Sequence, residues 1–205
     1  GEAQIIDNNK ILINLNDGNN KEIEAKNIVI ATGSIPTSIP GVEISGDKII
    51  SSTEALSLSE VPNRLVVVGG GYIGLELGSV WSRLGSEVTV IEYLDRITPG
   101  MDNEVSAALQ KILAKQGLSF SLNSQVVSVT ETDSNVSVEV KNRENDKEEN
   151  IEADYVLVST GRKPYIENLF SAGIDIEKTE NGFIKTDSHL RTNLEGIWAI
   201  GDVVE

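Results

Sequence analysis

The stretch that decides the fold is Arg64-Leu-Val-Val-Val-Gly-Gly-Gly-Tyr-Ile-Gly-Leu-Glu-Leu-Gly78. Its aliphatic run at 65–68 predicts a strand that is buried on both faces of a parallel sheet. Residues 72–84 predict a helix, and between strand and helix three glycines have the spacing Gly-x-Gly-x-x-Gly, at Gly69, Gly71 and Gly74. This order predicts a turn that binds the phosphates of a dinucleotide at the N-terminus of the helix.

Each glycine of this turn has its own expected role. Gly69 allows the tight turn out of the strand, Gly71 leaves room for a pyrophosphate, and Gly74 lets the helix pack closely on the strand. A second strand, at 86–92, ends in Glu92, about 20 positions past Gly74. A carboxylate there accepts hydrogen bonds from the adenosine ribose and repels a 2′-phosphate, so we expect a preference for NAD over NADP.

Composition excludes several classes of function. The 205 residues carry a net charge of −15, which makes nucleic acid and anionic membrane surfaces poor partners. There is no cysteine, which excludes a disulfide framework, a thiolate metal site and a cysteine nucleophile within these residues. The single histidine, His189, excludes a histidine metal cluster. The chain begins with Gly1 and shows no signal peptide, so we expect an excised piece of a longer protein or a processed product.

The remaining chain alternates strands with turn signals. A short helix is expected at 54–58, capped by Ser52 or Thr53, and a longer one at 103–116, capped by Asp102. The charged run 141–150 is interpreted as a solvated hairpin tip, and 35–41 as an extended connector. Strands are predicted at 11–15, 21–24, 27–31, 155–159 and 196–204, and the segments 118–122, 125–130 and 136–140 alternate like antiparallel strands.

An internal repeat indicates two domains of like design. Ile28-Val-Ile-Ala-Thr-Gly-Ser-Ile-Pro36 parallels Val156-Leu-Val-Ser-Thr-Gly-Arg-Lys-Pro164. The second copy closes the domain that contains Gly69, so the first copy is expected to close a similar one. We therefore predict an α/β fold: a Rossmann-like NAD-binding domain at 61–180 with an antiparallel β-meander, and two remnants of a similar FAD-binding domain at 1–60 and 181–205.

Taken together, these segments resemble the pyridine nucleotide–disulfide oxidoreductases, and within them the dihydrolipoamide dehydrogenases. The most specific part runs from Gly69 to Glu92 and on to Ile97, and the resemblance extends over essentially the whole chain. NADPH-using relatives place arginines near the position of Glu92; Arg96 is close, but a carboxylate holds that position here. The resemblance implies NAD contacts at Gly69, Gly70, Gly71, Tyr72, Ile73, Gly74, Glu76, Glu92, Val126 and Gly161, and FAD contacts at Ala31, Thr32, Gly33, Ser34, Gly201 and Asp202.

For two of these residues the sequence leaves a second role open. Glu76 matches a residue that faces the nicotinamide side in relatives, and it would otherwise be a solvated carboxylate on the helix. Tyr72 is either a lid over the nicotinamide pocket or a packing residue of the first helical turn.

The resemblance also implies what the parent enzyme does. It would be a flavoprotein that passes electrons from dihydrolipoamide through a cysteine pair and FAD to NAD⁺, as a homodimer within 2-oxo acid dehydrogenase complexes, in the bacterial cytoplasm or the mitochondrial matrix. The family's cysteine pair, first glycine motif and catalytic histidine are not in this chain, and His189 does not match that histidine. We therefore expect no catalytic residue, no tightly bound FAD and no activity of this chain alone.

Other functions remain open at this point. Within the superfamily the parent could be an NADH oxidase or a mercuric reductase. Outside it, the chain could be a stand-alone NAD-binding regulatory module.

Overall fold

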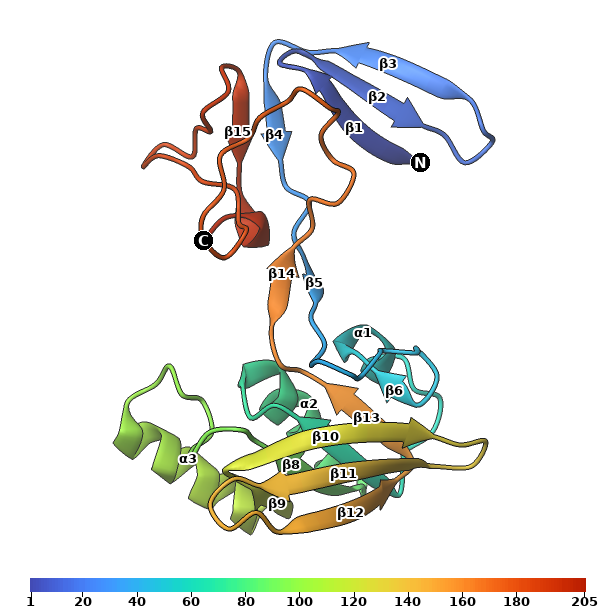
Figure 1. Ribbon diagram of the computed structural model, residues 1–205, viewed down its shortest axis with the longest axis vertical. Helices are drawn as coiled ribbons and strands as arrows, with labels where there is room; N and C mark the ends of the chain where they lie inside the picture. The colour runs from blue at the N-terminus through green and yellow to red at the C-terminus, as the bar shows by residue number, and fades with distance from the viewer. The chain divides into compact units, whose positions relative to one another are not determined.

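The computed structural model describes residues 1–205, which form two compact units (Figure 1). Unit 1 consists of 1–35 and 162–205, and unit 2 consists of 36–161. Unit 2 is therefore inserted into the sequence of unit 1, and the boundaries differ from the predicted ones at 60 and 180. None of the helices combines the length and the apolar character that crossing a membrane requires.

The centre of unit 2 is a parallel sheet built on the predicted strand before the glycine turn. Its order is β6 (Ile49–Ile50), β13 (Tyr155–Val158), β7 (Arg64–Val68), β8 (Glu87–Ile91) and β9 (Leu118–Ser121), and every neighbouring pair is parallel. The prediction that 118–122 belongs with antiparallel strands was wrong. This segment follows a helix that crosses over the sheet, and such a crossover returns the chain parallel to the strand before it.

Helices begin and end close to where the sequence predicts. Helix α2 spans Tyr72–Leu84, as expected from the apolar spacing. Helix α3 spans Asn103–Lys115 and has Asp102 as its N-cap, whose carboxylate accepts a hydrogen bond from the Glu104 amide at 2.9 Å. The carboxylate satisfies an amide that has no partner within the helix, which explains why the helix starts there.

Three antiparallel strands form the second sheet of unit 2, in the order β10 (Ser124–Glu131), β11 (Val136–Asn142) and β12 (Glu148–Ala153). The strands at 125–130 and 136–140 were therefore predicted correctly. The interpretation of 141–150 as a hairpin tip alone was too wide, because its last three residues already belong to β12. β12 is an edge strand with mostly exposed side chains, so it lacks the apolar alternation that marks a strand in sequence.

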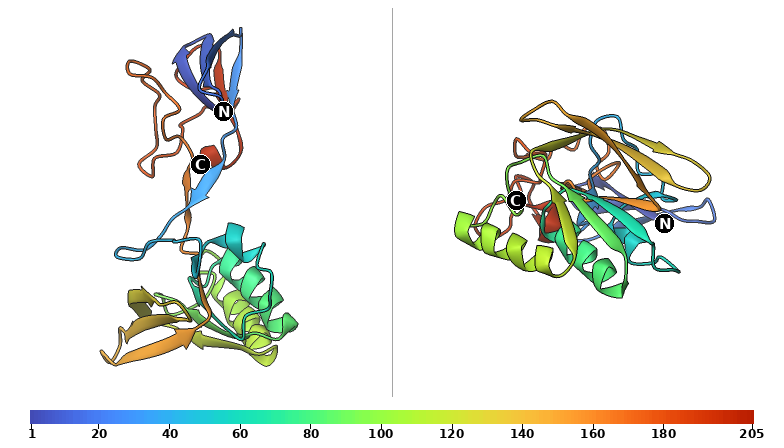
Figure 2. Two further views of the ribbon diagram at one scale, coloured as in Figure 1. Left: turned by 90° about the vertical axis from the view of Figure 1, so that its right-hand side faces the viewer. Right: turned by 90° about the horizontal axis from the view of Figure 1, so that it is seen from below.

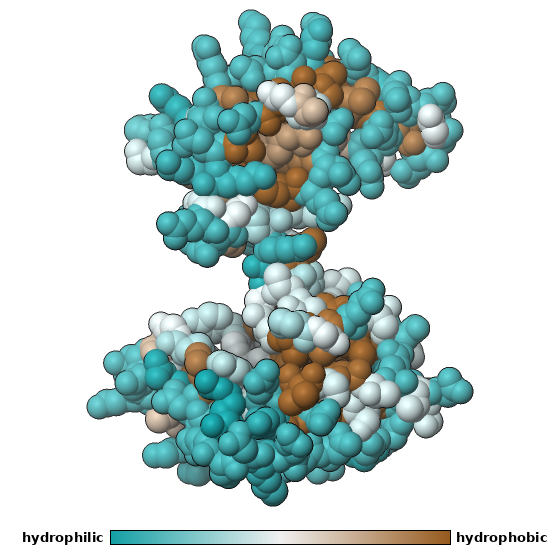
Figure 3. Space-filling model, viewed as in Figure 1, coloured by the Kyte–Doolittle hydropathy of each residue, from teal (hydrophilic) through white to brown (hydrophobic).

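Unit 2 has three layers, with the parallel sheet in the middle (Figure 2). Alternation along β7 builds both cores: Val66 and Val68 pack with the valines of the antiparallel sheet, while Leu65 and Val67 pack with α2 and α3. Both faces of β7 are thus covered, which is why its sequence is continuously apolar. In the space-filling view, apolar residues also gather on the visible surface of unit 2 around β10, surrounded by hydrophilic ones (Figure 3).

The segment 36–60 belongs to unit 2 because it supplies an edge strand and a helix to this sandwich. β6 pairs with β13, and α1 (Ser52–Ala55) follows it directly. The N-cap is Ser51, one residue before the predicted Ser52 or Thr53. Its hydroxyl accepts from the Thr53 amide at 3.2 Å and donates to the Glu54 carboxylate at 2.6 Å. This hydrogen bond holds the pKa of the Glu54 carboxyl below its ordinary value.

Replacing Ser51 by alanine is expected to lower the free energy of unfolding by about 1 kcal/mol, because a buried cap is lost. This loss of stability should shrink as the pH falls through the lowered pKa of Glu54. A protonated Glu54 carboxyl accepts the hydrogen bonds from the Ser51 hydroxyl and amide less strongly, so the wild type then gains less from Ser51. Urea denaturation of both proteins at pH 7 and below pH 4 measures this. An unchanged midpoint at pH 7 would show that the cap is not coupled to the fold of unit 2.

Unit 1 contains three small sheets. β1 (Glu2–Asp7), β2 (Lys10–Asn14) and β3 (Asn20–Glu24) are antiparallel, β4 (Ile28–Ile30) is parallel to β15 (Ile197–Ala199), and β5 (Ser34–Pro36) pairs with β14 (Arg162–Pro164). The predicted strand 196–204 stops after β15, and a short 3₁₀ helix, η1 (Gly201–Val203), follows. The core of unit 1 is aliphatic and joins both parts of its sequence: it contains Ile5, Ile28 and Ile30 from the first and Ile184, Ile197 and Val203 from the second.

The two ends of unit 2 are held together by hydrogen bonds. The Thr37 amide donates to the Gly161 carbonyl at 3.0 Å, and the Thr160 hydroxyl donates to the Thr37 carbonyl at 3.2 Å. The chain therefore enters and leaves unit 2 at neighbouring points.

Candidate functional site

A cavity of about 700 Å³ lies in unit 2, where the chain leaves the carboxyl ends of β13, β7 and β8. β7 is the first strand of the motif, with β8 on one side and β13 on the other, so the connections leave in opposite directions at this point. Open parallel sheets bind ligands at such a switch point. Most lining residues come from four places: the glycine turn and the start of α2, the segment 91–94 at the end of β8, the segment 124–127 of β10, and the segment 159–161 after β13. The connector residues Ile39 and Pro40, and Pro99, complete the lining.

The three glycines of the turn differ in what surrounds them. Gly69 has φ +105°, and a Cβ on it would lie 2.6 Å from the Ser159 carbonyl oxygen. A Cβ on Gly74 would collide with the Gly69 carbonyl oxygen and lie 2.9 Å from Val67 Cγ1. Around Gly71 nothing lies within 4 Å of such a Cβ, and this residue lines the cavity. Two glycines therefore serve the fold, and Gly71 leaves open space where a ligand can approach.

The N-terminus of α2 is left without a side-chain cap. Its N-cap is Gly71, whereas α1 and α3 are capped by Ser51 and Asp102. Tyr72 and Ile73, the first two residues of α2, line the cavity. Uncapped amides and the positive end of the helix dipole favour an anionic group at this position.

Glu92 connects two backbone segments beneath the cavity through its carboxylate. Its side chain is only 8% exposed, and its two carboxylate oxygens accept hydrogen bonds from the Gly70 amide at 2.6 Å and the Leu94 amide at 2.8 Å. It thus connects the glycine turn to the loop after β8. Each carboxylate oxygen has a second lone pair, so Glu92 can still accept a hydrogen bond from a ligand hydroxyl.

The structure brings most of the predicted NAD-site residues to one cavity. Gly69, Gly71, Tyr72, Ile73, Glu92, Val126 and Gly161 line it. Gly70, Gly74 and Glu76 do not: Gly70 lies against the Glu92 carboxylate, Gly74 is buried between helix and strand, and Glu76 is exposed on α2. Tyr72 is 61% exposed, so it is not a core residue of the first helical turn. The lid role of Tyr72 and the nicotinamide role of Glu76 stay predictions.

Several lining residues were not predicted, and most of them lie far from the motif in sequence. Ser159 follows β13 and donates its hydroxyl to the Val68 carbonyl at 3.0 Å, which ties β13 to the glycine turn. Tyr93 and Gln125 line the side near Glu92, and Ile39 comes from the connector that enters unit 2. Two of them had a sequence signal: Ser159 precedes the Thr160-Gly161 of the second repeat copy, and Tyr93 directly follows Glu92.

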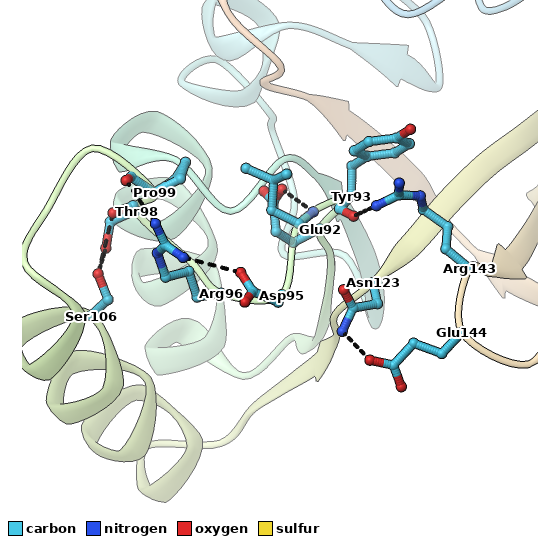
Figure 4. Close-up of polar contacts among 11 residues, drawn as sticks. Glu92, Tyr93, Asp95, Arg96, Thr98, Pro99, Ser106, Asn123, Arg143 and Glu144 are labelled. Atoms are coloured by element: carbon cyan, nitrogen blue, oxygen red, sulfur yellow. Dashed lines mark hydrogen bonds and ion pairs between the residues drawn. The ribbon is translucent and has the colours of Figure 1, made fainter.

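Arg96, the nearest cation in sequence to Glu92, is engaged with its own loop (Figure 4). It donates to the Asp95 carboxylate at 3.2 Å and to the Pro99 carbonyl at 3.5 Å, and it does not line the cavity. The cavity is therefore lined by the carboxylate of Glu92 and not by the guanidinium of Arg96.

In unit 1, the pairing of β4 with β15 brings the predicted FAD segments to one place. Ala31–Ser34 follow β4, and Gly201 and Asp202 follow β15. The Ser34 hydroxyl donates to the Asp202 carboxylate at 2.9 Å and accepts from Arg162 Nε at 2.7 Å. Arg162 also donates to the Ser34 carbonyl at 2.5 Å. The guanidinium fixes which way the hydroxyl donates, and Asp202 keeps its other oxygen for a ligand.

The predicted NAD residues of unit 2 and the predicted FAD residues of unit 1 differ in how well they fit a cofactor. The site in unit 2 has an open glycine, free helix amides and a hydroxyl acceptor, which are the groups that a dinucleotide requires. Unit 1 supplies an acceptor for a polyol hydroxyl at Asp202, but the only Gly-x-Gly-x-x-Gly turn in these residues is the one in unit 2. Of the two units, unit 2 thus has the more complete nucleotide site.

A parallel sheet with a glycine turn, an uncapped helix and an acidic residue at its switch point is the arrangement of the dinucleotide-binding α/β folds. The family model of the pyridine nucleotide-disulphide oxidoreductases matches residues 2–205. The chain belongs to this family.

Similar proteins fall within the same class. The chain is 50% identical over 194 residues to dihydrolipoyl dehydrogenase 3 of Pseudomonas putida, covering 95% of this chain and 41% of that protein. It is 48% identical over 203 residues to dihydrolipoamide dehydrogenase of Chaetomium thermophilum, covering 98% and 40%. The solved structure of a Cu(II) complex of the HOCl-induced flavoprotein disulfide reductase RclA from Escherichia coli matches with a TM-score of 0.85 and 30% identity, covering 99% of this chain and 45% of that one. The chain thus spans about 40% of the length of the curated relatives it matches.

Proposed function

We propose that unit 2 binds NAD(H), and that the chain supplies the NAD-binding domain and part of the FAD-binding domain of a dihydrolipoyl dehydrogenase. The relatives that carry this name support the assignment, since they are 50% and 48% identical to the chain, against 30% for the reductase RclA. The corresponding substrate is dihydrolipoamide. Homodimerisation, association with a 2-oxo acid dehydrogenase complex and a cytoplasmic or mitochondrial location belong to the same proposal.

The single observation that carries the NAD(H) proposal is that Gly71 and Glu92 face one cavity. The open space at Gly71 and the amides of Tyr72 and Ile73 suit a pyrophosphate. Glu92 suits the hydroxyls of the adenosine ribose. Val126 and Gly161 supply an uncharged wall to the same cavity.

The residues of this chain place cofactors and perform no bond-making step themselves. When bound, the nicotinamide accepts a hydride and the flavin relays electrons to it. In unit 1, Asp202 would accept a hydrogen bond from a ribityl hydroxyl, held in position through Ser34 and Arg162. The backbone of Ala31–Gly33 would pass beside the flavin. Glu76 and Tyr72 are proposed to act at the nicotinamide end of unit 2.

Calorimetric titration of the 205-residue chain should show binding of NADH and at least tenfold weaker binding of NADPH. A 2′-phosphate beside Glu92 is a like-charge contact, and tenfold corresponds to about 1.4 kcal/mol. In Glu92→Gln the ratio of the two affinities should fall toward one. Affinity for NADH should fall as well, because the NH2 group of glutamine replaces one of the two accepting oxygens and cannot accept from a backbone N–H.

Three results would contradict this proposal. NADPH binding as tight as NADH in the wild-type chain would remove the role of Glu92 in selectivity. An unchanged affinity ratio in Glu92→Gln would do the same. No heat of binding with millimolar NADH would show that unit 2 is not a nucleotide site.

A further inference from the structure

An arginine from the β11–β12 hairpin stacks on the aromatic residue next to Glu92. The Arg143 guanidinium carbon lies 3.7 Å from the centroid of the Tyr93 ring, and Arg143 Nη1 donates to the Tyr93 carbonyl at 2.9 Å (Figure 4). The two residues are 50 positions apart in sequence. This contact therefore depends on the hairpin being placed against the loop after β8.

The hairpin tip is fixed to that loop by further hydrogen bonds. The Arg143 amide donates to the Asn123 carbonyl at 2.7 Å, and the Asn123 amide donates to the Leu94 carbonyl at 2.8 Å. The side-chain amide of Asn123 donates to the Glu144 carboxylate at 2.9 Å. The tip is thus hydrogen-bonded, through Asn123, to the loop that contributes Tyr93 and Leu94 to the cavity, while its residues 143–150 are exposed as predicted.

Tyr93 combines a half-exposed side chain with a place in the lining of the cavity. Tyr93 is 50% exposed and lines the cavity together with Glu92, Gln125 and Val127, whereas Arg143 does not line it. The guanidinium covers one face of the ring and the residue is still half exposed, so the other face of the ring is open. Arg143 also restrains the ring, since it holds both the ring and the carbonyl of the same residue.

From this arrangement we infer that Tyr93, backed by Arg143, is the stacking platform for the adenine base. The inference rests on the proposed function. A base is attached to the ribose that Glu92 would hold, so it must lie within one sugar of that carboxylate, and Tyr93 is the adjoining residue. Aromatic side chains bind bases through their faces. Tyr93 contacts the base, and Arg143 is a positioning residue that acts through Tyr93.

Titration of the 205-residue chain with NADH and with ADP-ribose, which lacks nicotinamide, tests the inference. Tyr93→Leu should weaken both ligands by the same factor, about tenfold. Arg143→Ala should weaken both by about two- to fivefold, since the cation–π contact is partly exposed. Lys147→Ala removes one positive charge from the same hairpin without touching Tyr93, and it should leave both affinities unchanged.

A second measurement separates stacking from a structural effect. The adenine H2 and H8 resonances of ADP-ribose should move upfield on binding to the wild-type chain and to Lys147→Ala, but not to Tyr93→Leu. If the wild-type chain binds NADH while Tyr93→Leu matches it in affinity and shift, the stacking inference fails and the proposed function stands. If Arg143→Ala weakens NADPH more than NADH, Arg143 is a phosphate ligand and the inference is overturned. If the wild-type chain binds neither ligand, the proposed function fails with it.

Discussion

Gly71→Val should abolish the thermal stabilisation of the chain by NADH while a cooperative unfolding transition remains. Gly71 has φ −80° and ψ −177°, which valine can adopt, and nothing lies within 4 Å of a Cβ at this position. The valine side chain would fill the space proposed for the pyrophosphate, so affinity should fall by at least about 100-fold. Valine is a poorer N-cap than glycine, so the unliganded protein should lose about 1 kcal/mol.

Thermal melts with rising NADH measure this effect. A ligand at 100 times its dissociation constant stabilises the wild-type chain by about 2.7 kcal/mol, and a site weakened 100-fold gains only about 0.4 kcal/mol at the same concentration. Gly71→Ala, with a smaller side chain, should show an intermediate shift. A wild-type response in Gly71→Val would mean that NADH does not approach the chain at Gly71.

Gly74→Ala, three residues along the same motif, should act on the fold instead. Its Cβ would lie 2.5 Å from Ser159 Oγ and 2.9 Å from Val67 Cγ1, and closer still to the Gly69 carbonyl oxygen. Backbone and a buried strand cannot yield easily, so we expect a loss of about 3 kcal/mol or more in the free energy of unfolding. Urea denaturation followed by circular dichroism measures that loss.

Gly78→Ala is the matched control, one helical turn further on the buried face of α2. Its Cβ would lie 3.4 Å from Val88 Cγ1 and 3.5 Å from Val67 Cγ2, which is ordinary contact. Alanine also has a higher helix propensity than glycine. Gly78→Ala should therefore fold at least nearly as well as the wild type. Equal stability of Gly74→Ala and Gly78→Ala would show that close packing of α2 on β7 does not depend on Gly74.

Local signals in the sequence were sufficient for the centre of unit 2. The apolar run before Gly69, the glycine spacing and the second strand that ends in Glu92 follow one another within residues 65–92, so strand, turn, helix and Glu92 were predicted in the right order. The position of β9 was not predicted correctly. β9 is a short edge strand, and in such a strand the alternation of side chains does not distinguish parallel from antiparallel pairing. The crossover through α3 was the better guide.

Contacts between distant segments explain what the sequence did not reveal at the candidate site. Arg143 lies in a charged run that has no local signal for a binding role, and it reaches Tyr93 only through the hairpin geometry. The same holds for Arg162, whose partner Ser34 is 128 positions away. The repeat had already placed these two residues at equivalent positions, but nothing in one sequence shows that repeat copies contact each other.

The hydrogen-bonded ends of unit 2 have a consequence for the order of folding. While unit 2 is unfolded, unit 1 has to close a loop of roughly 125 residues to bring its two sequence parts together. Once unit 2 has folded, the Thr37 amide nitrogen lies 3.0 Å from the Gly161 carbonyl oxygen. The loop that unit 1 has to close is then only a few residues long. Loop entropy changes as (3/2)RT ln n, so this shortening is worth about 3 kcal/mol to unit 1. Folding of unit 2 thus lowers the entropic cost of folding unit 1, so we expect unit 2 to fold first.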